Sequence, residues 1–93
     1  MSEKLIWLIG AASVWAHRDR NDGTTFVQDT QTARIVQLSE EAFAWHVRTE
    51  TRNDDLEIVS ATESYAVMSS LYSAMGAAED AADDHMQRLE DER

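Results

Sequence analysis

Residues 60–89, SATESYAVMSSLYSAMGAAEDAADDHMQRL, decide the fold because apolar and small side chains recur through them at steps of three and four. The recurring positions are Tyr65, Met68, Tyr72, Met75, Ala78, Ala82, Met86 and Leu89. This spacing predicts a long amphipathic helix with one stripe facing a sheet. Ser60 and Glu63 have capping-box spacing, which predicts that the helix begins just after Ser60. Gly76 marks either a kink or the close approach of another backbone.

The residues before this helix are predicted to form antiparallel strands. Residues 3–18, EKLIWLIGAASVWAHR, are apolar at both odd and even positions. This indicates a strand that is covered on both faces and bent at Gly10. Asp22-Gly23 is a hairpin turn signal because Gly tolerates positive φ. Residues 24–29 and 32–39 follow as short strands, so the first part of the chain is predicted to be a three-strand meander.

Residues 38–52, LSEEAFAWHVRTETR, fit two structures. As a strand, they place Phe43, Trp45 and Val47 on one face and pair with residues 56–61 across the polar turn TRNDD. As a helix over 39–51, Ser39 is the N-cap and the two following Glu suit the positive end of the helix dipole. The predicted fold is therefore α+β in one domain, residues 1–93. It has an antiparallel sheet of three to five short strands, a long acidic C-terminal helix, and either a strand or a second helix at 39–51.

Charge is distributed unevenly along the chain. The net charge is -10, yet residues 1–52 hold six basic and seven acidic groups, whereas residues 53–93 hold two basic and eleven acidic groups. This field repels nucleic acid and anionic membranes and attracts basic protein surfaces. The chain has no Cys, which fits a reducing cytoplasm. The apolar segment 5–16 is too short to span a bilayer, and Glu3 cancels the charge of Lys4 that a signal peptide would need.

The acidic residues of the predicted helix are the candidate partner-binding site. They are Glu79, Asp80, Asp83, Asp84, Glu90 and Asp91. Like charges four apart destabilise a helix, and acids near its C-terminus oppose the dipole. Acidic residues that lower the stability of their own helix indicate a function. Here we expect them to mimic the phosphates of a nucleic acid. A solvated face that only keeps the protein soluble is the alternative.

No motif indicates catalysis, a cofactor or a metal ion. The chain lacks G-x-S-x-G, P-loop and G-x-G-x-x-G patterns. His17 and His46 could meet across the sheet, but a surface or core role fits each better. Asp80, Asp84 and His85 do not converge as metal ligands on one helix. The basic run from His17 to Arg20 is too short for a nucleic-acid patch and is expected to pair with the acidic helix, whereas Trp7, Trp15 and Trp45 are expected mainly in the core.

The short, Cys-free chain with the acidic stretch AEDAADDHMQRLEDE (78–92) is similar to small phage-encoded inhibitors of host defence, such as anti-CRISPR and DNA-mimic anti-restriction proteins. The likeness lies in composition and charge layout. It implies a non-enzymatic protein in the host cytoplasm that occupies the nucleic-acid channel of a defence complex, commonly a CRISPR effector, and needs no cofactor.

Two further functions remain open. A homodimeric structural or regulatory accessory protein would use the Tyr/Met/Ala face of the helix, with its small residues in SSLYSAMGAA, as its interface. A small enzyme or ligand-binding domain would have an enclosed pocket with convergent polar groups near His17 or His46.

Overall fold

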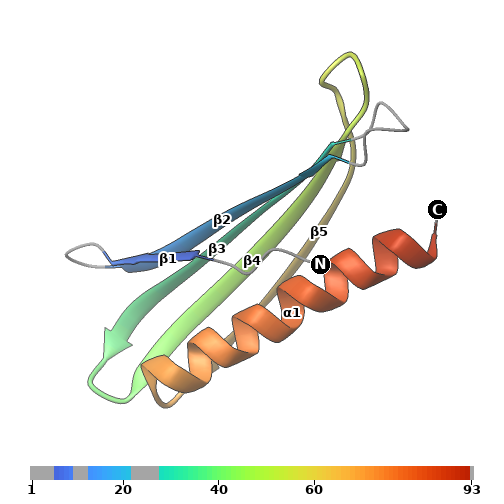
Figure 1. The fold of residues 1–93 in the computed structure, drawn as a ribbon. Coiled ribbons are helices and arrows are strands. Elements are labelled where there is room, and N and C mark those ends of the chain that lie inside the picture. The colour runs from blue at the N-terminus through green and yellow to red at the C-terminus, as the bar shows by residue number, and fades with distance from the viewer. Residues whose placement is uncertain (1–5, 10–12, 22–27, 93) are drawn as a thin grey trace.

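Five antiparallel strands form one sheet in which every strand lies beside its neighbour in the sequence (Figure 1). The computed structural model describes residues 6–9, 13–21 and 28–92. The strands are β1 (Ile6–Ile9), β2 (Ser13–Asn21), β3 (Gln28–Ser39), β4 (Ala42–Arg52) and β5 (Ile58–Met68), and the helix α1 (Leu71–Asp91) follows them. The prediction of an antiparallel sheet with a long C-terminal helix is therefore confirmed.

The core lies on one face of β3 and β4, where buried and more exposed residues alternate. The register pairs Ala33 with Val47 and Ile35 with Trp45, and all four side chains are buried. Since alternate residues of a strand point to opposite faces, these four share the face that α1 covers. The predicted face of Phe43, Trp45 and Val47 is confirmed, with Phe43 partly buried against this core.

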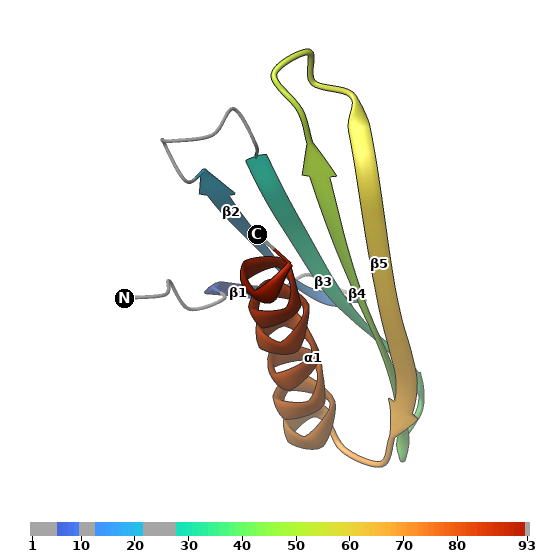
Figure 2. The ribbon, with the colours of Figure 1, turned by 90° about the vertical axis from the view of Figure 1, so that its right-hand side faces the viewer.

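The helix lies over this face of the sheet (Figure 2). It contacts the sheet through a stripe of alanines. Ala74, Ala78 and Ala82 are fully buried in the core cluster, with Met75 packed partly against it. Side chains this small let the helix backbone come close to the sheet. The predicted Met/Ala stripe thus packs on its own sheet, while Tyr72 remains 86% exposed.

The helix begins ten residues later than the capping box at Ser60 predicted. Ser60 and Glu63 lie within β5, and the N-cap is Ser70, whose hydroxyl accepts a hydrogen bond from the backbone N–H of Ser73 at 3.1 Å. The capping-box prediction is wrong because β5 pairs along its length with β4, from Phe43↔Met68 to Arg52↔Ile58. Tertiary pairing satisfies the backbone groups of this segment, which overrides its helical spacing.

Several strand boundaries also differ from the predictions. Residues 39–51, for which the sequence fitted both a strand and a helix, comprise the last residue of β3, a turn and most of the strand β4. The predicted pairing of this strand with the segment after TRNDD is confirmed. Residues 6–9 and 13–21 form two strands of a hairpin instead of one bent strand, and 28–39 is one strand of 12 residues where two short ones were expected. Gly10 and the turn Asp22-Gly23 lie outside the described residues, although the strands that flank the turn do pair antiparallel.

The structure shows no feature at Gly76 that requires a glycine. A Cβ added there would meet nothing within 4 Å, and α1 is continuous through it. We expect Gly76→Ala to raise the free energy of unfolding by about 0.5–1 kcal/mol, because Ala loses less backbone entropy in a helix. Chemical denaturation measures the change.

The matched control is Ala78→Gly, which removes a buried methyl group from the same helix. It should lower the free energy of unfolding by more than about 1 kcal/mol. A loss of stability in Gly76→Ala would contradict this account and indicate that the helix needs flexibility at Gly76.

Candidate functional site

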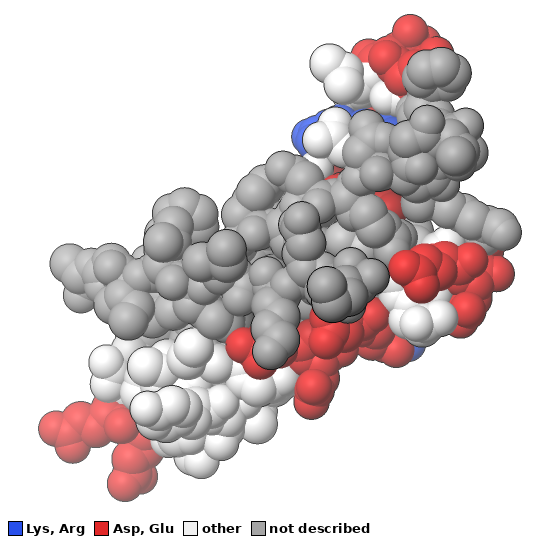
Figure 3. All heavy atoms as spheres, viewed as in Figure 1, with Lys and Arg blue, Asp and Glu red and all other residues white. Residues whose placement is uncertain are grey.

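The six candidate acids lie along the outer side of α1. We call Glu79, Asp80, Asp83, Asp84, Glu90 and Asp91 the acidic face, and all six are exposed. Figure 3 shows carboxylates gathered along this helix. The structure thus brings together every acidic residue that the sequence predicted for this site, in one exposed band.

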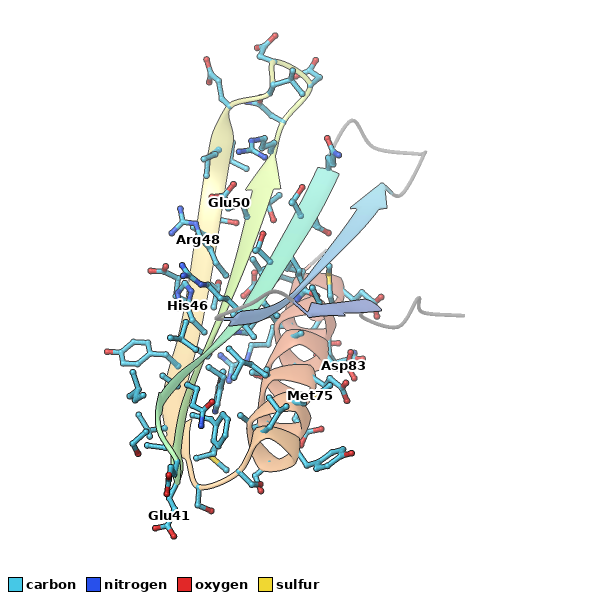
Figure 4. All side chains as sticks on the ribbon, turned by 90° about the vertical axis from the view of Figure 1, so that its left-hand side faces the viewer. Glu41, His46, Arg48, Glu50, Met75 and Asp83 are labelled. Atoms are coloured by element: carbon cyan, nitrogen blue, oxygen red, sulfur yellow. The ribbon has the colours of Figure 1, made fainter. Side chains whose placement is uncertain are left out.

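The helical repeat arranges the acidic face as two rows. At about 100° per residue, Glu79, Asp83 and Glu90 form one row, and Asp80, Asp84 and Asp91 form the second, roughly 100° around the helix. The buried alanines point toward the sheet, and the two acidic rows lie on either side of the direction that points away from it. In Figure 4, Asp83 points from α1 away from the sheet. The sheet therefore holds the acids outward, toward solvent or a partner.

Two contacts within the helix restrain the second row. Arg88 Nε lies 3.0 Å from Asp84 Oδ2, an i,i+4 ion pair, and Gln87 Nε2 donates to Asp91 Oδ1 at 3.0 Å. Both contacts are exposed, so each adds only a few tenths of a kcal/mol. The first turn of α1 has no acidic residue, and most of the acids lie in its C-terminal half, where the helix dipole disfavours negative charge. Arg88 is the basic residue of the last turn.

Beneath the acidic face is a buried polar cluster that was not expected from the sequence. Gln31 is fully buried, and its Nε2 donates to Thr49 Oγ1 at 2.9 Å and to the carbonyl oxygen of Ala82 at 2.7 Å. His85 lies between two hydroxyls, with Nδ1 2.8 Å from Thr49 Oγ1 and Nε2 2.9 Å from Ser64 Oγ. The cluster links β3, β4, β5 and α1, and so fixes the rotation of the helix on the sheet.

These contacts suit a neutral His85. With the Thr49 hydroxyl donating to Nδ1, the imidazole proton sits on Nε2 and is donated to Ser64. Burial lowers the pKa of His85, Arg88 lowers it further, and the neighbouring charge of Asp84 opposes these two effects. One signal in the sequence could have revealed this position: His85 falls between Ala82 and Leu89 at steps of three and four, within the buried stripe.

The lowered pKa of His85 predicts acid sensitivity. Below about pH 6.5 the unfolded chain binds a proton at His85 that the folded protein binds only at lower pH. The free energy of unfolding should therefore fall as the pH drops from about 7 to 5, by up to ~1.4 kcal/mol per pH unit from this group. Urea titrations of the wild type and His85→Gln at several pH values measure it, and His85→Gln should decline less steeply.

The control is Gln37→Ala, which removes an exposed polar side chain that does not titrate. This variant should keep the slope of the wild type. Equal slopes in the wild type and His85→Gln would show that His85 does not titrate differently on folding.

The face of the sheet away from α1 carries a chain of ion pairs. Arg48 lies 2.6 Å from Glu50 and 3.2 Å from Glu63; Arg52 contacts Glu50 at 2.8 Å, and His46 contacts Glu63 at 3.0 Å. Hydrogen bonds from Arg48, and then from His46, lower the pKa of Glu63. Figure 4 shows His46 and Arg48 on this side of the sheet. Acids and bases balance here, in contrast to α1.

A groove of about 550 Å³ lies on the same face, lined by Arg34, Val36, Ala44, Trp45, His46, Tyr65, Ala66 and Val67. Its wall residues Tyr65 and Val67 are 78% and 59% exposed, so the groove is a surface feature. The Nε1 atom of Trp45 is buried without a hydrogen-bond partner among the described residues. The groove thus differs from the enclosed pocket with convergent polar groups that a small enzyme would require.

The backbone register shows where His17 lies relative to His46. His17 of β2 is in register with Thr32, whereas His46 is in register with Arg34, and β3 separates the two strands. Arg18 and Arg20 are in register with Gln31 and Asp29. The side chains of Trp7, Trp15 and the run from His17 to Arg20 lie outside the described part of the molecule, so their predicted roles stay predictions. Trp45 is in the core as expected.

In the described ranges, no group of three or more His, Asp or Glu side chains is placed to hold a metal ion. Among the same residues, no helix has both the length and the apolar character needed to cross a bilayer. No protein-family model, curated protein or solved structure matches this chain. The acidic face is therefore the feature of the molecule that bears on its function.

Proposed function

We propose that the protein is a non-enzymatic inhibitor that binds a basic nucleic-acid-binding protein through its acidic face. Carboxylates on successive turns of α1 take the positions of backbone phosphates and contact the Lys and Arg side chains that would otherwise hold nucleic acid. The observation that carries the proposal is the exposure of all six acids on one helix whose opposite side is buried.

The charge density of the helix supports mimicry. Seven acidic residues occur from Glu79 to Glu92, and Arg88 offsets one of them. At a rise of about 1.5 Å per residue, this segment is about 21 Å long, which gives one net charge per ~3.5 Å. One strand of DNA carries one charge per about 3.4 Å of helix axis. The acidic part of α1 thus matches a nucleic-acid strand in linear charge density.

The attachment of α1 to the sheet also supports the proposal. Its alanine stripe and the Gln31–Ala82 hydrogen bond hold the helix in one rotation. A helix that is ordered before binding loses little conformational entropy when it meets a partner. The acidic face therefore acts as a rigid template, unlike an acidic tail that would have to order on contact.

For the partner, we propose an RNA-guided defence complex, most specifically a CRISPR effector in the host cytoplasm. Such complexes hold nucleic acid in a positively charged channel and recognise it largely through its backbone. A single acidic helix, exposed on the surface of a small domain, suits a channel of this kind. The similarity in composition and charge to phage-encoded inhibitors supports this partner over other basic proteins. Direct nucleic-acid binding is disfavoured by the charge of -10.

The test is inhibition of target-DNA binding by purified CRISPR effector complexes, measured by fluorescence anisotropy at about 0.1 M and 0.5 M salt. The wild type should block DNA binding by its target complex at low salt and lose potency at high salt. The variant E79Q/D80N/D83N/D84N should lose about tenfold or more in potency, because each exposed contact contributes some tenths of a kcal/mol.

The matched control neutralises four exposed acids outside the helix, in the variant E40Q/E41Q/D54N/D55N. It changes the net charge by the same amount and should inhibit like the wild type. Equal inhibition by the wild type and the helix variant would contradict mimicry and leave the acidic face a solvated surface. Urea denaturation checks that the helix variant stays folded, with unchanged or higher stability.

A further inference from the structure

The outer edge of β5 is open along its length in the described part of the chain. β5 is the last strand in the sheet order, and it pairs with β4 on one side. Residues 58–63 and 65–67 are all exposed. An edge of 11 residues is long, and natural proteins protect such edges with Lys, Pro or bulges. β5 contains neither Lys nor Pro, and Glu63 is its one charged residue. Its register with β4 shifts near its start, at Val59, and the strand is regular from Ser60 to Met68.

Exposed apolar side chains follow this edge on the face away from α1. Tyr65 and Val67 are 78% and 59% exposed, and Ala61 on the same face is also exposed. Register places Tyr65 beside His46 and Val67 beside Ala44, on the face opposite the buried core. An unpaired backbone beside exposed β-branched and aromatic side chains is the arrangement that accepts another strand.

We propose that two copies of this chain pair antiparallel through β5 and form one continuous ten-stranded sheet. In such a pair, opposite residues must point to the same face, so a twofold axis perpendicular to the sheet has to pass between two copies of one residue. We call this residue the centre of the pairing. The sequence of β5 decides which residue it is.

Ser64 is the centre that the regular part of β5 favours. It pairs every residue from Ser60 to Met68, with Val67 opposite Ala61 of the second copy and Tyr65 opposite Glu63, and no like charges face each other. A centre at Glu63 would put two carboxylates opposite each other, and a centre nearer either end of the strand would pair fewer of its regular residues. The regular part of β5 is therefore self-complementary about Ser64, which argues for a second copy as the occupant.

Charge also permits this pairing. Glu63 is already paired with Arg48 and His46 of its own chain, and the acidic face lies on α1. The net charge of -10 on each chain opposes association at low ionic strength. Salt should therefore strengthen the dimer, whereas it weakens binding through the acidic face. The opposite salt dependences separate this inference from the proposed function, on which it does not rest.

The perpendicular axis places both helices on the same face of the joined sheet. The dimer would present two acidic faces on one side, and a target with two basic sites would bind it more tightly than one copy. Pairing through β5 leaves the acidic face exposed, so it adds a second binding surface without using the first.

Sedimentation equilibrium at about 1–300 μM protein, in 0.15 M and 0.5 M salt, tests the dimer. We expect a mass rising toward twice the 10.5 kDa chain mass, at lower concentration in the higher salt. The variant A61K/V67K places Lys opposite Lys in the Ser64-centred register and should stay monomeric. The variant A61K/V67E places opposite charges there and should dimerise again.

The control variant L38K/Y72K replaces two other exposed apolar residues, with the same change in charge, and should dimerise like the wild type. Circular dichroism melts check that each variant is folded. A wild type that stays monomeric at both salt concentrations would overturn the proposal and leave the edge to a strand of another protein. A dimer that persists in A61K/V67K would also overturn it, because the interface would then lie elsewhere.

Discussion

The packing of three alanines of α1 against β3 and β4 is the contact on which the rest of the structure depends. Ala74, Ala78 and Ala82 are fully buried, and they face Ile35, Trp45 and Val47 in one cluster. Because alanine adds little bulk, the helix comes close enough for Gln31 to reach the carbonyl oxygen of Ala82. The apolar stripe and the hydrogen bond then hold the helix in a single rotation.

That rotation gives the two sides of α1 different functions. The buried side packs against the core of the sheet, in a chain too small for a second core. The outer side carries the acidic face, where like charges four residues apart lower the stability of the helix. The sheet offsets this cost, since a packed helix does not rely on its own propensity. A rigid, densely charged surface is thereby possible on a protein of 93 residues.

The two faces of the sheet differ in the same way. One face is covered by α1, and the other carries balanced ion pairs around Arg48 and exposed apolar residues toward β5. In the described part of the chain, no element covers this second face. The edge strand β5 borders both the covered and the open regions, which makes it the natural place for the sheet to extend. The acidic face and the β5 edge can thus serve different partners at the same time.

The sequence by itself determined the α+β class, the acidic helix and the members of the acidic face, because a helical charge pattern and an apolar stripe are local properties. It also predicted the side of β4 that carries Trp45 and Val47. The start of the helix, the extent of β5 and the cluster of Gln31, Thr49 and His85 were decided only by the tertiary structure. Residues 60–68 fit a helix locally, yet pairing with β4 satisfies their backbone as a strand. The partners of the buried polar groups lie 18 to 51 residues away.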